Sequence, residues 1–182
     1  MRRQTRETDV YVEVSTGPGS TEVATGDSVF DHMLRTLYFH ARFSGTVRAT
    51  WDLRHHLWED VGITMGGQEL RRFRENCARF HSTIVPMDES LVLCSVDVSR
   101  AFLSFDMDVR EAEGFDPMLV REFMWALCRE LGLTLHIVGM RVGGNTHHAV
   151  EASFKALGMC LAVRSGPLTG PRARRGHYDG RC

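Results

Sequence analysis

Several features that would assign this chain to a specialised class of protein are missing from its 182 residues. The cysteines number five and form no Cys-x-x-Cys pair, so we expect reduced thiols rather than a disulfide framework. No apolar run is long enough to span a membrane, and the opening MRRQTRETDVYVEV contains no apolar signal segment. The net charge of −1 gives no general attraction to nucleic acid or to acidic membranes. We therefore expect a cytoplasmic globular protein that binds neither nucleic acid nor membranes.

Lysine is also nearly absent, because Lys155 is the only one and every other basic residue is arginine. Genomic base composition is the simplest explanation for this usage. The one retained lysine nevertheless follows the second of two repeated histidine motifs, which makes it a weak candidate for a functional cation.

The elements predicted from hydrophobic periodicity occur in the same order in both halves of the chain. Alternating or β-branched segments predict strands over residues 9–14, 46–53, 90–99, 101–109 and 133–140. Helical spacing predicts helices over residues 28–45, 55–73, 115–132 and 147–164. The fragments VFDHML and GFDPML are the visible remains of a duplication. We expect a tandem α+β repeat, each half a small sheet covered on one face by two helices.

The expected boundaries follow from the same pattern. Ser28 or Asp31 is a candidate N-cap for the first helix, and Gly45 a candidate stop. Thr146 is the expected N-cap of the last helix, and Gly132 the expected stop of the helix before it. We predict a first repeat over 1–81, a second over 82–165, and a flexible Arg-, Gly- and Pro-rich tail over 166–182.

Four of the nine histidines fall in two copies of a His-His-x-x-Glu motif, each at the start of a predicted helix. The copies are His55, His56 and Glu59, then His147, His148 and Glu151. Adjacent histidines diverge by roughly 100° around a helix axis, so each should face a different ion. The glutamate, three and four residues further on, is a neighbour of both.

A single motif of this kind is more often the polar face of a helix than a set of metal ligands. Two copies in register within an internal repeat favour the metal interpretation. Imidazole and carboxylate ligands without thiolate fit Mn, Fe, Ni or Zn, and ligand type alone does not choose among them. A generic metallohydrolase is disfavoured, because the sequence contains no His-Glu-x-x-His motif.

The segments FDHML, HHLWEDVGITMG, ARFHSTIVPMDES and GLTLH…NTHHAVEASFKALG resemble the imidazoleglycerol-phosphate dehydratase family of histidine biosynthesis. The resemblance runs from about Arg3 to Leu161. It implies a duplicated ferredoxin-like fold (the ribosomal protein S5 domain 2-like type), assembled from trimers into a 24-subunit shell. It also implies two Mn²⁺ ions per active site, held between subunits, and the dehydration of imidazole glycerol phosphate to imidazole acetol phosphate.

The resemblance carries a set of metal ligands onto this chain. These are His32, His55, His56, Glu59, Glu122, His147, His148 and Glu151. Glu122 stands where the family usually has a histidine, and its charge would change the Lewis acidity of the ion.

The remaining family roles fall on five residues. Arg79, Arg100 and Lys155 match substrate-binding positions, while Glu7 and His40 match an acid/base glutamate and a histidine near the substrate. Without the resemblance, Glu7 would be an exposed charge, His40 a surface or core histidine, and each arginine a solvated side chain.

The chain departs from the family at several substrate-binding positions. The C-terminal Ser-Thr-Lys-Gly phosphate loop is absent, Thr36 replaces a glutamine, and His81 replaces a glycine. The segment TWDLRHH is short and lacks an Asp-Asp lead-in. Losing two charged hydrogen bonds, at about 1.5–3 kcal/mol each, would weaken phosphate binding by orders of magnitude.

Two hypotheses follow from these departures. The chain is an active dehydratase, with tail arginines such as Arg172, Arg174 and Arg175 replacing the missing lysine. Alternatively, it is a divergent paralogue that keeps the metal-linked shell and acts on another small molecule, or serves as a non-catalytic metal-binding assembly.

Overall fold

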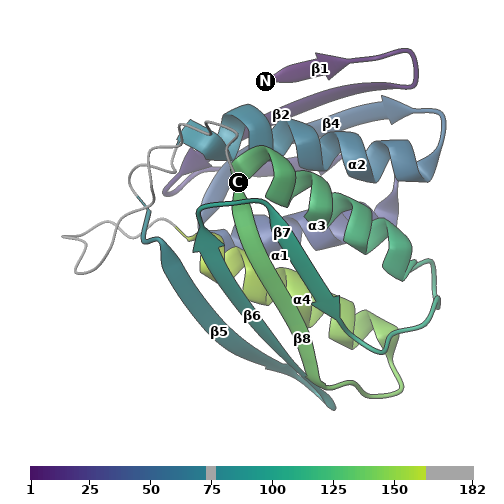
Figure 1. The fold of residues 1–182 in the computed structure, drawn as a ribbon. Coiled ribbons are helices and arrows are strands. Elements are labelled where there is room, and N and C mark those ends of the chain that lie inside the picture. The colour runs from purple at the N-terminus through teal and green to yellow at the C-terminus, as the bar shows by residue number, and fades with distance from the viewer. Residues whose placement is uncertain (73–76, 163–182) are drawn as a thin grey trace, which may run out of the picture.

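The computed structural model describes residues 1–72 and 77–162 (Figure 1). The first half contains β1 (Arg2–Gln4), β2 (Thr8–Thr16), β3 (Thr21–Ala24), α1 (Ser28–Ala41), β4 (Phe43–Trp51), α2 (Arg54–Thr64) and the π-helix η1 (Met65–Leu70). The second half contains β5 (Phe80–Met87), β6 (Ser90–Val98), β7 (Phe102–Asp106), α3 (Pro117–Leu131), β8 (Leu133–Arg141) and α4 (Thr146–Leu161). The predicted tail, with its three arginines, lies outside the described residues.

The two halves have the same sheet topology, which confirms the predicted α+β class and the duplication. The strand orders are β1-β2-β4-β3 and β5-β6-β8-β7, with one parallel pair in each, β3 with β4 and β7 with β8. Strands β1, β3 and β5 are not predicted by hydrophobic periodicity, and all three lie at sheet edges. Edge strands can be short, polar or proline-containing, so they lack the apolar alternation that reveals inner strands.

The four helices form two inner layers between the two sheets (Figure 1). Helices α1 and α2 cover the first sheet, and α3 and α4 cover the second. Between these layers α1 packs on α4, and α2 packs on α3. Both faces of each helix layer are therefore buried, and the core includes the large side chains of Phe30, Trp58, Phe123 and Phe154. This arrangement brings residues of the two halves together along the helix pairs.

A glycine permits close contact in each helix pair. A Cβ atom on Gly158 of α4 would lie 2.7 Å from the carbonyl oxygen of Leu37 in α1. A Cβ atom on Gly66 of η1 would lie 2.9 Å from the carbonyl oxygen of Leu127 in α3. Both distances are shorter than a Cβ atom tolerates, so any larger residue would push the helices apart. The matching contacts show that the two pairs are related by the duplication.

The helix ends differ in part from the sequence-based expectation. Asp27, and not Ser28 or Asp31, caps α1, because its side chain accepts hydrogen bonds from the backbone of the first turn. The helix ends at Arg42 in the left-handed region, with φ of 57°, before Gly45, which lies within β4. Asn145 rather than Thr146 caps α4. Each true cap directly precedes the expected one and leaves its neighbour free to enter the first turn.

The Gly132 stop of α3 is confirmed, with φ of 67° at that residue. Within residues 1–72 and 77–162, no helix combines the length and the apolar character that a membrane crossing requires.

Asp27 also joins the starts of α1 and α2. Its Oδ2 atom accepts hydrogen bonds from Arg54 Nε at 2.9 Å and from Trp58 Nε1 at 3.1 Å, while Oδ1 accepts from the amides of Val29 and Phe30. Burial alone would raise the pKa of this carboxyl, but the hydrogen bonds from Arg54, Trp58 and Phe30 outweigh burial and lower the pKa.

Replacing Asp27 by Asn should lower the free energy of unfolding at pH 7 by about 1.5–3 kcal/mol, because charged hydrogen bonds are lost. A carboxyl whose folded pKa is depressed stabilises the protein above its unfolded pKa of about 3.9, and this contribution disappears as the pH falls through the folded pKa. Urea denaturation should therefore show a weaker acid-range pH dependence for Asp27→Asn than for the parent, whereas equal pH dependence would contradict the assignment. Exposed Glu111→Gln is the control.

Candidate active site

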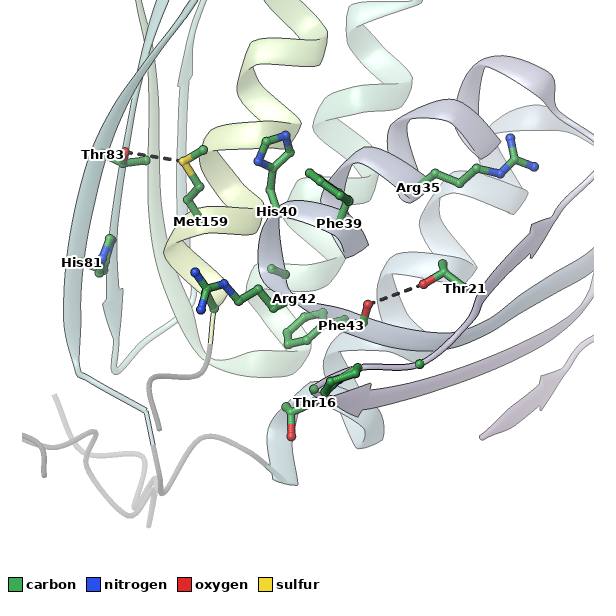
Figure 2. Close-up of a pocket in the computed structure, with 15 residues that line it drawn as sticks. Thr16, Thr21, Arg35, Phe39, His40, Arg42, Phe43, His81, Thr83 and Met159 are labelled. Atoms are coloured by element: carbon green, nitrogen blue, oxygen red, sulfur yellow. Dashed lines mark hydrogen bonds between the residues drawn. The ribbon is translucent and has the colours of Figure 1, made fainter. Parts of the chain in front are cut away.

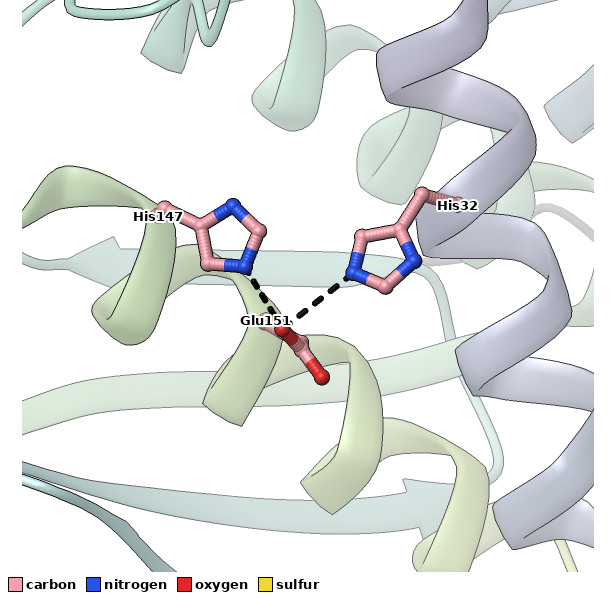
Figure 3. A group of neighbouring side chains, drawn as sticks. All are labelled: His32, His147 and Glu151. Atoms are coloured by element: carbon pink, nitrogen blue, oxygen red, sulfur yellow. Dashed lines mark hydrogen bonds and ion pairs between the residues drawn. The ribbon is translucent and has the colours of Figure 1, made fainter.

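The second histidine motif forms a group of three donors with a residue of the other half (Figure 3). His147 and Glu151 lie one turn apart on α4, with His147 Nε2 2.8 Å from Glu151 Oε2. His32 of α1 places its Nε2 atom 3.2 Å from the same Glu151 oxygen. The two imidazole rings stack with centroids 5.4 Å apart. The α1–α4 contact thus unites residues 119 positions apart in the sequence.

Glu151 is the charged centre of this group and is buried. Its other oxygen, Oε1, lies 3.1 Å from Nζ of Lys155, the only lysine of the chain. Burial alone would raise the pKa of Glu151, but Lys155 and His32 together lower it. The carboxylate is therefore ionised at neutral pH and available as a ligand.

The donor set fits a divalent transition ion. One ligand atom from each of His32, His147 and Glu151 lies within 4.8 Å of the other two. Two imidazole nitrogens and one carboxylate oxygen are ligand types that suit such ions. Three protein ligands would also leave positions for a substrate or for a residue of another chain.

His148 belongs to a different group from its neighbour His147, as the expected divergence of adjacent histidines requires. Its Nδ1 atom is 2.9 Å from Glu89 Oε2, and its Nε2 atom is 3.5 Å from Asp88 Oδ2. These three residues are the second place where three metal-type donors lie within 4.8 Å of one another. Asp88 and Glu89 form the turn between β5 and β6. The segment MDES was recognised in the sequence, but nothing in its pattern assigned these two acids to His148.

The first histidine motif is more exposed to solvent than the second. His56 Nδ1 lies 2.7 Å from Asp52 Oδ1, and His56 Nε2 lies 3.8 Å from Glu7 Oε2. His55 is exposed, and its ring contacts that of His56 with centroids 4.1 Å apart. Glu59 instead faces Arg129 of α3, with Oε1 3.7 Å from the guanidinium.

Glu122 occupies the position in its half that His32 occupies in the other. A step of 90 residues relates Leu37 to Leu127 at the two glycine contacts, and the same step relates His32 to Glu122. The fragments VFDHML and GFDPML, 85 residues apart, are therefore not equivalent in the structure, contrary to the sequence-based expectation. In the part of the chain that the structure describes, however, His55, Glu59 and Glu122 do not form a three-donor group.

Two arginines predicted to bind substrate lie near Asp97, Arg79 just before β5 and Arg100 just after β6. Arg79 makes a paired contact with Asp97, Nε to Oδ1 at 2.7 Å and Nη2 to Oδ2 at 3.1 Å. Hydrogen bonds from Arg79 and Ser99 outweigh burial and lower the pKa of Asp97, and the charge of Arg100 adds to this effect. Asp97 therefore compensates the charge of Arg79, while Arg100 adds positive charge near the same end of the second sheet.

His40 lies beside Lys155 and faces an open groove of about 1240 Å³ (Figure 2). Burial, and then the charge of Lys155, lower the pKa of His40, so the ring is neutral at pH 7. Arg42 and His81 line the same groove. The departure from the family at His81 thus alters the surface next to His40.

Replacing Glu151 by Ala should remove the charged donor and lower the affinity for a divalent transition ion at least about 100-fold, because even supporting residues of metal sites contribute 10–100-fold. The metal content per chain after dialysis, measured by inductively coupled plasma mass spectrometry, should fall accordingly. Glu22→Ala, which removes an exposed partner of Arg48 on the first sheet, is the matched control. Equal metal content in both variants would contradict the ligand assignment.

Comparison with known proteins agrees with this geometry. The family model described as imidazoleglycerol-phosphate dehydratase matches residues 25–161. The imidazoleglycerol-phosphate dehydratase of Pyrococcus furiosus is 46% identical over 165 residues, covering 90% of this chain and 92% of the relative. That of Rhodopseudomonas palustris strain BisB5 is 42% identical over 183 residues, covering 95% and 91%.

Solved structures give the same result. The P. furiosus enzyme superimposes with a TM-score of 0.79 at 46% identity, covering 90% of this chain and 92% of that one. The Staphylococcus aureus enzyme gives a TM-score of 0.76 at 33% identity, covering 90% and 95%. The chain therefore belongs to the imidazoleglycerol-phosphate dehydratase family.

Proposed function

We propose that the protein catalyses the metal-dependent dehydration of imidazole glycerol phosphate to imidazole acetol phosphate, a step of histidine biosynthesis. The observation that carries the proposal is the convergence of His32, His147 and Glu151 on one point between the two halves. Family membership supports the dehydratase activity. The proposal includes Mn²⁺ as the metal, two ions per active site, the residue roles described below and a cytoplasmic location.

A divalent ion held by His32, His147 and Glu151 would act as a Lewis acid toward the imidazole ring or the hydroxyl groups of the substrate. We assign Mn²⁺ to this role, with two ions per active site. The ionised Glu151 supplies negative charge to the first ion, and Lys155 holds one of its oxygens at 3.1 Å. His148, which turns away from this point, would contribute to the second site.

Dehydration breaks one C–H bond and one C–O bond and releases water, so a protein group must accept a proton and return it. Glu7 is the candidate for this role. Its carboxylate lies 3.8 Å from His56 Nε2, and its side chain is 56% exposed, which leaves it accessible to a substrate. General acid–base catalysis of this kind contributes about 10²–10⁴-fold to a rate.

The phosphate group requires cations held by the fold. Arg79 and Arg100, at the end of the second sheet, are the candidates, and Lys155 provides a third positive charge beside Glu151. The tail arginines proposed to replace the missing lysine lie outside the described residues.

The open state of the first motif supports an active site shared between chains. His55 is exposed, and Glu59 and Glu122 are only partly buried. These side chains are accessible to a second copy of the chain. They could therefore act as ligands of the ion that His32, His147 and Glu151 of that second copy hold. This is the basis for proposing metal-linked assembly of trimers into a 24-mer.

Protein loaded with Mn²⁺ should convert imidazole glycerol phosphate to imidazole acetol phosphate, and Glu7→Gln should lower kcat at least about 100-fold because the proton acceptor is lost. Product formation in a coupled or mass-spectrometric assay measures both. Glu13→Gln, which changes an exposed acid on the adjoining strand β2, should leave kcat unchanged. No turnover by a metal-loaded, assembled parent protein would instead support the divergent paralogue with another substrate or a non-catalytic role.

A further inference from the structure

The second histidine of each motif is held at the same ring nitrogen by a carboxylate. His148 Nδ1 lies 2.9 Å from Glu89 Oε2, and His56 Nδ1 lies 2.7 Å from Asp52 Oδ1. The two histidines occupy equivalent positions in the duplicated halves, 92 residues apart. The two carboxylates, in contrast, come from different places. Asp52 lies four residues before His56, just ahead of α2, whereas Glu89 belongs to the β5–β6 turn.

These contacts determine which ring nitrogen can bind another partner. An ionised carboxylate only accepts hydrogen bonds, so the Nδ1 atom of each ring must carry the proton and donate it. In the neutral ring, the lone pair then lies on Nε2. The Nε2 atoms face Asp88 at 3.5 Å in one half and Glu7 at 3.8 Å in the other. The Nε2 atom of His148 also lies 3.3 Å from Nδ2 of Asn145, which can donate a hydrogen bond to it. Each ring therefore turns Nε2 toward a second acid, on the side away from the holding carboxylate.

The carboxylate of Glu89 is itself fixed by the backbone. Its Oε1 atom accepts a hydrogen bond from the Asn145 amide at 3.3 Å, at the start of α4. A Cβ atom on Gly143 would lie 1.7 Å from Glu89 Cγ, so only a glycine leaves room for this side chain. Asp52 Oδ1 likewise accepts from the Leu53 amide at 2.6 Å. Both carboxylates are thus oriented before any ligand binds.

We propose that Asp52 and Glu89 are positioning residues, which hold the Nδ1–H groups of His56 and His148 so that Nε2 of each ring faces the metal and substrate. The inference rests on the proposed metal-dependent function. Carboxylates that hold ligating histidines in this way fix the tautomer and ring orientation and make the imidazole a stronger ligand.

A purely structural role predicts a different pattern from a positioning role. Exposed ion pairs contribute little to stability, and Asp52 and Glu89 have side chains 51% and 37% exposed. Removing either carboxylate should therefore leave the thermal unfolding midpoint of the metal-free protein unchanged while weakening metal binding.

The test measures the Mn²⁺ dissociation constant from the electron paramagnetic resonance signal of free Mn²⁺, for the full chain as it assembles. Glu89→Ala and Asp52→Ala should each lower affinity about 10–100-fold. Glu89→Gln and Asp52→Asn should recover most of this loss, because an amide oxygen still accepts the Nδ1–H hydrogen bond. Exposed Glu111→Ala is the matched control and should bind like the parent.

Three results would overturn the inference: unchanged affinity in both alanine variants, no recovery in the amide variants, or a fall in the metal-free unfolding midpoint that parallels the loss of affinity. Absence of both Mn²⁺ binding and turnover in the parent protein would overturn the proposed function and this inference with it. A parent that binds Mn²⁺ and turns over substrate, with alanine variants of unchanged affinity, would overturn the positioning role alone.

Discussion

The close contact between α1 and α4 is the constraint on which the candidate site depends. Gly158 permits it, since a Cβ atom there would lie 2.7 Å from the Leu37 carbonyl oxygen and 3.0 Å from His40 Cβ. Only at this separation can His32 of one half reach Glu151 of the other. The contact also places His40 beside Lys155, whose charge contributes to lowering the pKa of the His40 ring and that of Glu151. The packing of α1 on α4 therefore determines both the geometry of the candidate site and the charges around it.

The duplication explains both the symmetry and the asymmetry of the site. The two halves share a sheet order, a glycine contact between helices and a His-His-x-x-Glu motif. The two halves differ in the side chains at the helix contacts that carry the candidate metal ligands. One helix pair joins His32 to Glu151, whereas the other has Glu122 at the equivalent position and directs Glu59 toward Arg129. One motif is assembled within the chain and the other remains open, as an active site shared between chains would require.

Local patterns in the sequence were sufficient for part of this picture. The spacing of each motif predicts that neighbouring histidines separate. His147 and His148 do lie in different groups, whereas the rings of His55 and His56 are in contact, with centroids 4.1 Å apart. Periodicity identifies every helix and the inner strands. The contact of His32 with Glu151 spans 119 residues, and only the resemblance to the family suggested it. The edge strands β1, β3 and β5 were not predicted, and neither were the caps Asp27 and Asn145, because these segments carry no clear apolar period. Glu89 reaches His148 only through the turn geometry of β5 and β6, which periodicity does not describe.

The most direct test is the position of the ion in crystals of the Mn²⁺-loaded protein, from anomalous difference density at the manganese absorption edge. The account predicts a peak coordinated by Nε2 of His32, Nε2 of His147 and a carboxylate oxygen of Glu151. It also predicts that the remaining ligands of that ion come from the first motif of a neighbouring chain. Density elsewhere, or none at this point in fully loaded crystals, would contradict it.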